Sequence, residues 1–468
     1  MARITVESGA RLVVAVAVAL AASPLAQAGP SAYRVKDINP GAAGSDPTNL
    51  TDVNGTLFFV PADGELWKSD GTELGTVRVK DIRPGGLGSN PAWLASFNGL
   101  LFFQADDGVN GVELWKSDGT TVGTVMVKDI NPGGDAYPGY MVVLNGVLFF
   151  GADDGVHGYE LWKTDGNTIG TVMVKDIIPG AVGGTPALFA NVNGVLFFSA
   201  DDGVTGREPW MSDGTTSGTV LVRDIRAGPD PSFPDTFTGA GGLAFFIADD
   251  GINGWELWRS DGTFFGTFMV KDVKPGAFDS NIVFPVDVNG TLFFAADDGV
   301  NGRELWKSDG TTVGTVLAAD VMFPGPTGSN PHSLIAVGGT LFLIAHDNPF
   351  QESLWVTDGT PAGTAELYDE VAGYGPIPVF STLANFYGRL FFSGTDLFGT
   401  ELWTSNGRVY GTYIVQDIQP AFGSSNPTSL TASGGLLFFV ADDGVTGPEL
   451  WAADVIFDSA FEFLAPPG

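Results

Sequence analysis

A tryptophan recurs along this chain at a nearly constant interval, and this spacing limits the fold more strongly than any other feature. Each copy stands in a version of the phrase "GVELWKSDGTTVGTVMVKDI", which in the second unit begins at Gly111. Such even spacing indicates one structural unit per copy, so the chain is a repeat array. The nine anchoring residues, 47 to 49 positions apart, are Trp67, Trp115, Trp162, Trp210, Trp258, Trp306, Trp355, Trp403 and Trp451.

Each unit contains four short segments with strand character. In the unit of Trp115 they are "NPAWLASFNG", "LLFFQADDG", "VELWKSDG" and "TVMVKDI". Gly, Asn, Asp and Pro occupy the joints between them, as tight turns require. No stretch after residue 28 keeps an apolar period typical of a helix. We therefore predict an all-β chain of four-stranded units.

The two ends of the array complement each other. Residues 33–41, "YRVKDINPG", resemble the fourth strand of a unit, but the first three strands of that unit do not precede them. Residues 447–454, "GPELWAAD", contain the third strand of the last unit, and the usual fourth strand does not follow. A ring closed by joining them leaves no long unpaired edge. We predict one β-propeller of about nine four-stranded blades over residues 29–454, closed by the N-terminal strand completing the last blade. The alternatives are an open solenoid, or a last blade completed by the tail, residues 455–468.

The first 28 residues have the pattern of an export signal. Arg3 and Arg11 precede an apolar run over residues 12–22, and Ala26-Gln27-Ala28 offers a cleavage site of small residues. The alternative, a retained membrane anchor, needs ~20 apolar residues, more than this run provides. We expect a secreted protein, periplasmic or extracellular, with no membrane span once residues 1–28 are removed.

Composition narrows the partners of the chain. The formal net charge is −32, and it becomes −33 when two arginines and one glutamate leave with residues 1–28. Such a surface repels phosphate backbones, so nucleic acid is not an expected partner. The chain has 35 phenylalanines and 44% hydrophobic residues, which indicates a folded protein. It has no cysteine, so no disulfide stabilises it.

Three residues of the repeated phrase have structural interpretations. The tryptophans are expected to pack between adjacent blades. The "SDGT" aspartate, Asp118 in the second unit, is expected to cap the turn between the third and fourth strands. If Trp115 lies opposite Met126 on the neighbouring strand, Glu113 lies opposite Lys128. We then expect the two side chains to form a cross-strand ion pair, so that the glutamate is structural rather than a catalytic acid. The same register predicts Glu65–Lys80, Glu160–Lys175, Glu208–Arg223, Glu256–Lys271 and Glu449–Lys36.

Pairs of aspartates in the "ADDG" turns are the candidate metal ligands. Alternating strand directions place these turns and the connections between blades on the same face of a propeller. Neighbouring carboxylates repel unless they are hydrogen-bonded or bridged, and Ca²⁺ takes six to eight oxygens from such loops. The alternative is that these aspartates cap glycine turns and face water. The candidate calcium ligands are Asp106, Asp107, Asp153, Asp154, Asp201, Asp202, Asp249, Asp250, Asp297, Asp298, Asp442 and Asp443.

A second candidate metal site involves two of the three histidines. His332 and His346 fall in two loops expected on the same face of one unit, and Asp347 adjoins the second histidine. Two imidazoles and a carboxylate are ligands for a transition metal if they converge. The unit that contains them lacks the glutamate–lysine pair, and a departure from a repeat can mark either a site or drift.

The phrase "ELWKSDGT" resembles the repeats of bacterial secreted ELWxxDGT-repeat proteins, also called hyalin-like. The resemblance covers essentially the whole chain after the export signal, and it implies an extracellular repeat protein with no established reaction. The chain has no Gly-x-Ser-x-Gly elbow, phosphate loop, zinc-protease helix or cysteine nucleophile. We therefore expect a non-enzymatic, calcium-supported module that binds a protein or glycan partner at the cell surface. The alternatives are a glycan hydrolase or lyase on a propeller scaffold, and a structural envelope or matrix component.

Overall fold

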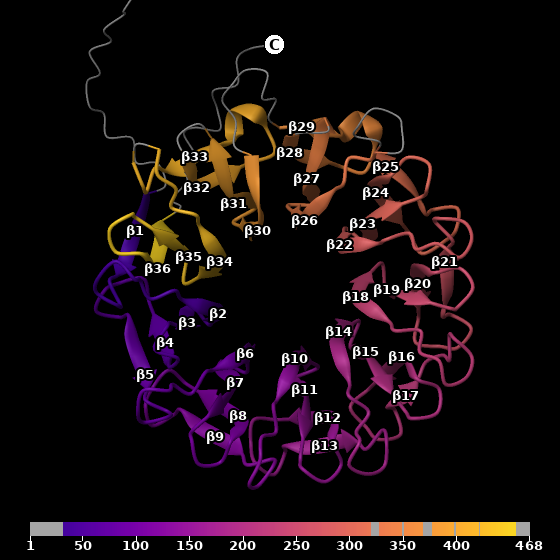
Figure 1. The fold of residues 1–468 in the computed structure, drawn as a ribbon, viewed down its shortest axis with the longest axis horizontal. Coiled ribbons are helices and arrows are strands. Elements are labelled where there is room, and N and C mark those ends of the chain that lie inside the picture. The colour runs from indigo at the N-terminus through magenta and orange to yellow at the C-terminus, as the bar shows by residue number, and fades with distance from the viewer. Residues whose placement is uncertain are drawn as a thin grey trace, which may run out of the picture.

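A computed structural model describes residues 31–319, 327–348, 351–367, 377–396, 399–420 and 422–454. Over these ranges the strands form nine antiparallel four-stranded sheets, arranged as a closed ring around a central opening (Figure 1). The prediction of an all-β propeller with nine blades is confirmed, and the solenoid alternative is wrong. The predicted export signal and the tail, residues 455–468, lie outside the described residues.

Each sheet is one blade, numbered from the first complete one, and its first strand lies nearest the central opening (Figure 1). Blade 1 consists of β2 (Thr48–Val53), β3 (Thr56–Val60), β4 (Leu66–Ser69) and β5 (Val77–Lys80). Blade 2 consists of β6 (Ala92–Phe97), β7 (Leu100–Asp106), β8 (Val112–Ser117) and β9 (Val125–Lys128). Blade 3 consists of β10 (Gly139–Leu144), β11 (Val147–Asp153), β12 (Tyr159–Thr164) and β13 (Val172–Lys175). Blade 4 consists of β14 (Ala187–Val192), β15 (Val195–Asp201), β16 (Arg207–Ser212) and β17 (Val220–Leu221). Blade 5 consists of β18 (Asp235–Ala240), β19 (Leu243–Asp249), β20 (Trp255–Ser260) and β21 (Phe268–Lys271). Blade 6 consists of β22 (Val283–Val288), β23 (Thr291–Asp297), β24 (Arg303–Ser308) and β25 (Val316–Ala319).

Blades 7 to 9 complete the ring. Blade 7 consists of β26 (His332–Val337), β27 (Thr340–Asn348), β28 (Gln351–Thr357) and β29 (Ala365–Glu366). Blade 8 consists of β30 (Ile377–Phe386), β31 (Arg389–Asp396), β32 (Gly399–Ser405) and β33 (Tyr413–Gln416). Blade 9 consists of β34 (Thr428–Ser433), β35 (Leu436–Asp442), β36 (Pro448–Asp454) and β1 (Ser31–Lys36). Two 3-10 turns, η1 (Pro361–Gly363) and η3 (Val409–Gly411), lie in blades 7 and 8. Over the described ranges, no helix has the length and apolar character to cross a membrane.

The ring closes where β1 joins blade 9, so the indigo start of the chain lies beside its yellow end (Figure 1). Strand β1 pairs antiparallel with β36, with Arg34 opposite Trp451. The carboxylate of Glu449 adds a second tie, since it accepts hydrogen bonds from Ile38 N at 3.2 Å and Ser45 Oγ at 2.5 Å. The predicted closure is confirmed. The alternative in which residues 455–468 complete this blade is wrong, because β1 occupies the position.

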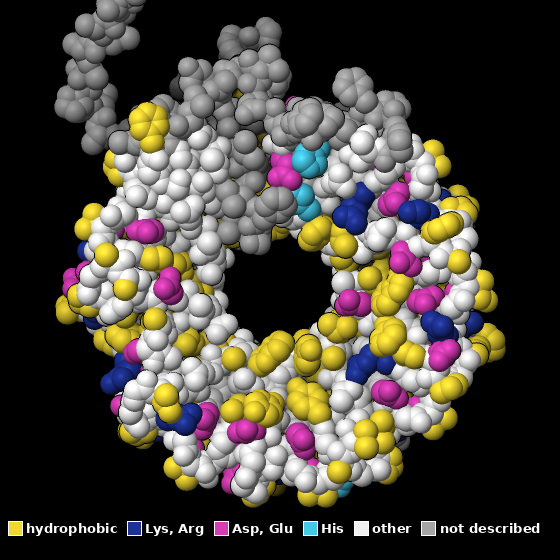
Figure 2. Space-filling view, viewed as in Figure 1, with side chains coloured by type: hydrophobic (Ala, Val, Ile, Leu, Met, Phe, Trp, Pro, Cys, Tyr) yellow, Lys and Arg dark blue, Asp and Glu magenta, His cyan; other side chains and the backbone are white. Residues whose placement is uncertain are grey.

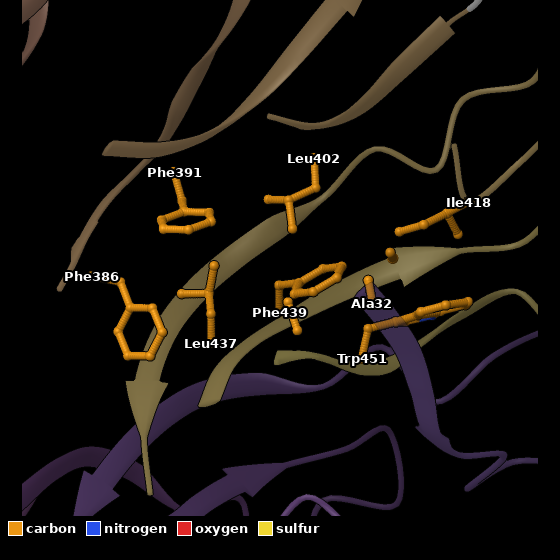
Figure 3. Close-up of a cluster of buried hydrophobic side chains, with 10 residues drawn as sticks. Ala32, Phe386, Phe391, Leu402, Ile418, Leu437, Phe439 and Trp451 are labelled. Carbon is orange, nitrogen blue, oxygen red and sulfur yellow. The ribbon is translucent and has the colours of Figure 1, made fainter. Parts of the chain in front are cut away.

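The hydrophobic core lies between blades. Residues 101 to 103 of β7 are all buried, because neighbouring blades cover both faces of the sheet. Trp162 packs with Leu114 of blade 2 and Phe150 of blade 3, and it is 5% exposed. At the closure, Ala32 of β1 joins Trp451 and residues of blade 8 in one such cluster (Figure 3). The interpretation of the tryptophans as packing between blades is confirmed.

The predicted glutamate–lysine ion pairs are wrong, although the register that motivated them is partly right. Trp115 lies opposite Met126 as expected, but a bulge on β9 places Leu114, not Glu113, opposite Lys128. The same irregularity occurs at the corresponding position of most other blades, and at the closure it pairs Lys36 with Leu450. One extra residue on a strand moves the following side chains to the other face, which breaks the expected pairing.

The glutamate and the lysine instead have separate structural roles. Glu113 is fully buried, and its carboxylate accepts hydrogen bonds from Ile130 N at 2.7 Å and Asn131 N at 3.2 Å. It therefore fixes the connection to the next blade. Lys128 Nζ donates to Thr171 O of the next blade at 2.8 Å, and it lies 5.5 Å from the centre of the Trp162 ring. The lysine thus ties two blades together.

Candidate functional site

The "SDGT" aspartates cap turns, as predicted. Asp118 Oδ1 accepts hydrogen bonds from the Thr120 amide at 2.8 Å and from Thr120 Oγ1 at 2.7 Å. The hydroxyls of Ser117 and Thr124 meet 2.7 Å apart beneath the same turn. The hydrogen bond from the Thr120 hydroxyl, followed by the one from its amide, holds the pKa of Asp118 below its ordinary value. Asp118 is therefore a turn cap whose ionised form is favoured.

The "ADDG" aspartates also hydrogen-bond within their own turns. Asp107 Oδ1 accepts from Val109 N at 2.9 Å and Asn110 N at 2.8 Å, and its Oδ2 accepts from Asn110 Nδ2 at 2.7 Å. Asp106 accepts from Gly108 N at 2.6 Å and pairs with Arg83. The same turn contacts recur at Asp153, Asp154, Asp201, Asp202, Asp249, Asp250, Asp297, Asp298, Asp442 and Asp443.

These turns and the connections between blades lie on one face, as expected. The Asp106 amide donates to Ser89 O at 3.0 Å, and Ala136 N donates to Val112 O at 2.9 Å. In the described part of the chain, no group of three or more His, Cys, Asp or Glu side chains is arranged to hold a metal ion. Amide donors account for the aspartate contacts without a metal, so calcium stays a prediction that rests on the sequence pattern.

The buried glutamates make stability depend on pH. Burial raises the pKa of Glu113, Glu208 and Glu256 from 4.5 to about 7. The folded state therefore binds more protons than the unfolded state between these values, and stability falls as pH rises through this window. We therefore expect the midpoint of thermal unfolding to be roughly a few degrees higher at pH 5 than at pH 8.

Calorimetry over this pH range, with a matched pair of variants, checks the prediction. Glu113→Gln should flatten the pH dependence in part, because Glu160, Glu208, Glu256 and Glu449, whose pKa burial also raises, remain. Glu73→Gln changes an exposed glutamate and should leave the slope as it is. A midpoint that is constant or rises from pH 5 to 8 would contradict the assignment.

Two positions vary from unit to unit within the otherwise constant repeat. The first lies within the bulge near the start of the first strand, between Ala92 and Ala95 in blade 2. A non-glycine residue has positive φ there, a conformation that costs about 1–3 kcal/mol and clusters at functional sites. The second precedes the glutamate of the third strand. The first set is Asn49, Trp93, Tyr140, Leu188, Thr236, Phe284, Ser333 and Ser429. The second set is Gly64, Val112, Tyr159, Arg207, Trp255, Arg303, Glu352, Thr400 and Pro448.

Residues of both sets line a pocket of about 630 Å³ across blades 3 to 5. The rings of Phe233 and Trp255 are stacked at 6.3 Å with 14° between their planes. Tyr140 and Tyr159 line the same pocket, and Asp235 is its one acidic residue. Figure 2 shows hydrophobic side chains gathered on this face around the central opening. The pocket thus offers aromatic faces with a few polar groups, a composition typical of ligand sites.

The two predicted histidines converge, but on a glutamate that the sequence pattern did not indicate. His332 Nε2 lies 3.3 Å and His346 Nε2 3.4 Å from Glu352 Oε1. Burial lowers the pKa of His332 although Glu352 opposes the shift. Figure 2 shows histidine side chains beside an acidic one over blade 7. The candidate ligand Asp347 lies in β27, and its side chain is outside the described ones.

The histidines and Glu352 line a second pocket of about 610 Å³ between blades 6 and 7. Phe284 and Arg303 of blade 6 also line it. Sequence reasoning missed Glu352, Arg303 and Phe284 of the second pocket. In the first pocket it missed Tyr140, Tyr159 and Phe233, whereas Trp255 stands outside the register of the nine anchoring tryptophans and is recognisable as a surface candidate. Comparing the nine units position by position would have found most of them, because they fall on the two variable positions.

Comparisons with known proteins identify no family for the chain. No protein-family model matches it, and no curated protein matches it. A computationally designed protein, Ika8, has a TM-score of 0.45 and 14% identity, with 89% of this chain and 99% of that chain covered. A puromycin-hydrolyzing peptidase of Mycobacterium tuberculosis has a TM-score of 0.39 and 12% identity, with 78% and 59% covered. Oligopeptidase B of Leishmania major has a TM-score of 0.41 and 11% identity, with 75% and 52% covered.

Proposed function

We propose that this chain is a secreted binding module that recognises a glycan in the pocket across blades 3 to 5. The observation that carries the proposal is the set of aromatic side chains, Tyr140, Tyr159, Phe233 and Trp255, around one pocket of about 630 Å³. Aromatic rings offer large apolar faces on which the C–H face of a sugar ring can stack. Hydroxyls of Thr185 and Ser199 and the carboxylate of Asp235 line the same pocket, and they suit sugar hydroxyls.

The lining of the two pockets favours binding over glycoside hydrolysis. Most glycosidases use two carboxyl groups flanking the bond that breaks. Among the described side chains, the first pocket has one acidic residue in its lining, Asp235, and the second has one, Glu352. The sequence patterns for export and for ELWxxDGT repeats support a location outside the cell, where glycans are available ligands.

A glycan-array screen of the chain without residues 1–28 tests the proposal, followed by titration of the retained glycan. Trp255→Ala should weaken binding about 10-fold or more, because it removes one face of the aromatic pair. Phe265→Ala is the matched control, since it removes an exposed aromatic ring from the turn between β20 and β21 of the same blade, at the opposite end of β20. It should bind like the unchanged protein.

Two outcomes would count against a glycan ligand at this pocket: no glycan is retained on the array, or Trp255→Ala binds as well as Phe265→Ala. The screen is run both with calcium and with a chelator. If calcium supports the module, the chelator should lower both the affinity and the thermal midpoint. If neither changes, calcium is removed from the proposal and the glycan site remains.

A further inference from the structure

A cationic side chain in the second pocket has no ion-pair partner among the described residues. The Nε atom of Arg303 is buried without a hydrogen-bond partner. The acidic residue opposite Arg303 in the sheet is Asp297, on β23. Its carboxylate bonds to Lys274 Nζ at 2.7 Å, and Arg303 acts on it through its charge alone, without a hydrogen bond. A guanidinium left unpaired in a protein with net charge −32 requires an explanation.

The equivalent arginine two blades earlier shows what a structural role looks like. Arg207 Nη1 donates to Ser199 O at 3.2 Å and to Ser199 Oγ at 3.3 Å, and Nη2 donates to Thr185 O at 3.0 Å. In blade 6 the positions of Ser199 and Thr185 are occupied by Ala295 and Asn281. The hydroxyls that hold Arg207 therefore have no counterpart at Ala295. Among the described residues Arg303 also makes no hydrogen bond to the carbonyls that Ala295 and Asn281 still offer, so its donors are left for a ligand.

The surroundings of Arg303 define the ligand further. Phe284 is 46% exposed, and its ring centre is 6.4 Å from that of His332. His332, His346 and Glu352 form a hydrogen-bonded group on the facing blade that can bind hydroxyls. The pocket thus combines an apolar ring face, groups for hydroxyls and one unpaired guanidinium, whose donor geometry matches a carboxylate.

We propose that the pocket between blades 6 and 7 binds a carboxylate-bearing sugar, with Arg303 pairing to the carboxylate and Phe284 facing the sugar ring. This site is separate from the aromatic pocket of blades 3 to 5, and it does not depend on a glycan binding there. It also gives the chain two sites of different chemistry on one face, built from the same two variable positions of the repeat.

Isothermal titration of the chain without residues 1–28 tests this site with tri-galacturonic acid as probe and maltotriose as the neutral comparison. We expect binding of the uronate and no measurable binding of maltotriose at this site. Arg303→Gln should weaken uronate binding about 10- to 100-fold, because it removes the charged donor. Its thermal midpoint should be unchanged, since Arg303 makes no hydrogen bond to the described protein that would be lost.

Arg207→Gln is the matched control at the same repeat position. It should lose thermal stability, because it breaks the bonds to Ser199 and Thr185, and it should keep uronate binding. Trp255→Ala should also keep uronate binding, which separates this proposal from the glycan site in blades 3 to 5. Equal binding of Arg303→Gln and the unchanged protein would overturn the assignment. So would equal affinity for maltotriose, no uronate binding, or full displacement by equimolar inorganic phosphate.

Discussion

Replacing Trp162 with alanine is expected to lower the free energy of unfolding by about 3–5 kcal/mol. The side chain is 5% exposed and fills the space between blades 2 and 3, so its removal leaves a cavity that two rigid sheets cannot close. The loss also removes the ring beneath Lys128 Nζ, a contact of about 0.5–2 kcal/mol. The indole Nε1 has no hydrogen-bond partner among the described residues, so packing rather than hydrogen bonding should account for the effect.

Denaturant unfolding followed by tryptophan fluorescence measures the loss. Trp93→Ala is the control, because Trp93 is 47% exposed and its ring packs against that of Tyr140, with ring centres 4.9 Å apart. Its removal should cost about 1 kcal/mol. If both variants lost the same stability, the anchoring tryptophans would not be the main contacts between blades.

Deleting residues 29–39 is expected to open the ring and to lower the thermal midpoint by roughly 10 °C or more. The deletion removes β1, which buries Ala32 and Val35 and pairs with β36 along its length. It also removes the Ile38 and Asn39 amides that donate hydrogen bonds to the buried carboxylate of Glu449. Strand β36 then becomes an exposed edge that can pair with another chain.

Calorimetry and light scattering after size-exclusion chromatography check this prediction. The shortened chain should form oligomers, and a synthetic peptide of residues 31–39 added in excess should restore the monomer. Deleting residues 455–468 is the control, and it should leave the midpoint unchanged because β1 already completes blade 9. A stable monomer without β1 would show that closure contributes little.

Most of the fold could be predicted because its signals are local and repeated nine times. The interval between tryptophans set the size of the unit, the glycine and aspartate turns marked its strands, and the split unit at the two ends predicted the closure. Errors arose where strict alternation along a strand was assumed. A bulge on β9 leaves Val127 as an extra residue between the partners of Trp115 and Leu114, and it moves Lys128 away from Glu113. The residues of β9 carry no sequence signal for this bulge.

The candidate sites were harder to predict because their parts come from different blades. His332 and His346 were selected from the sequence, but Glu352 and Arg303 join them only through the pairing of β27 with β28 and the packing of blade 6 against blade 7. By itself the sequence determined the repeat, because turns and strand patterns act within each unit, and it predicted about nine blades and the closure, which the structure then confirmed. Only the tertiary structure decided which variable side chains share a pocket and which charged groups have partners, because contacts between blades depend on strand register and on the angle at which neighbouring sheets meet.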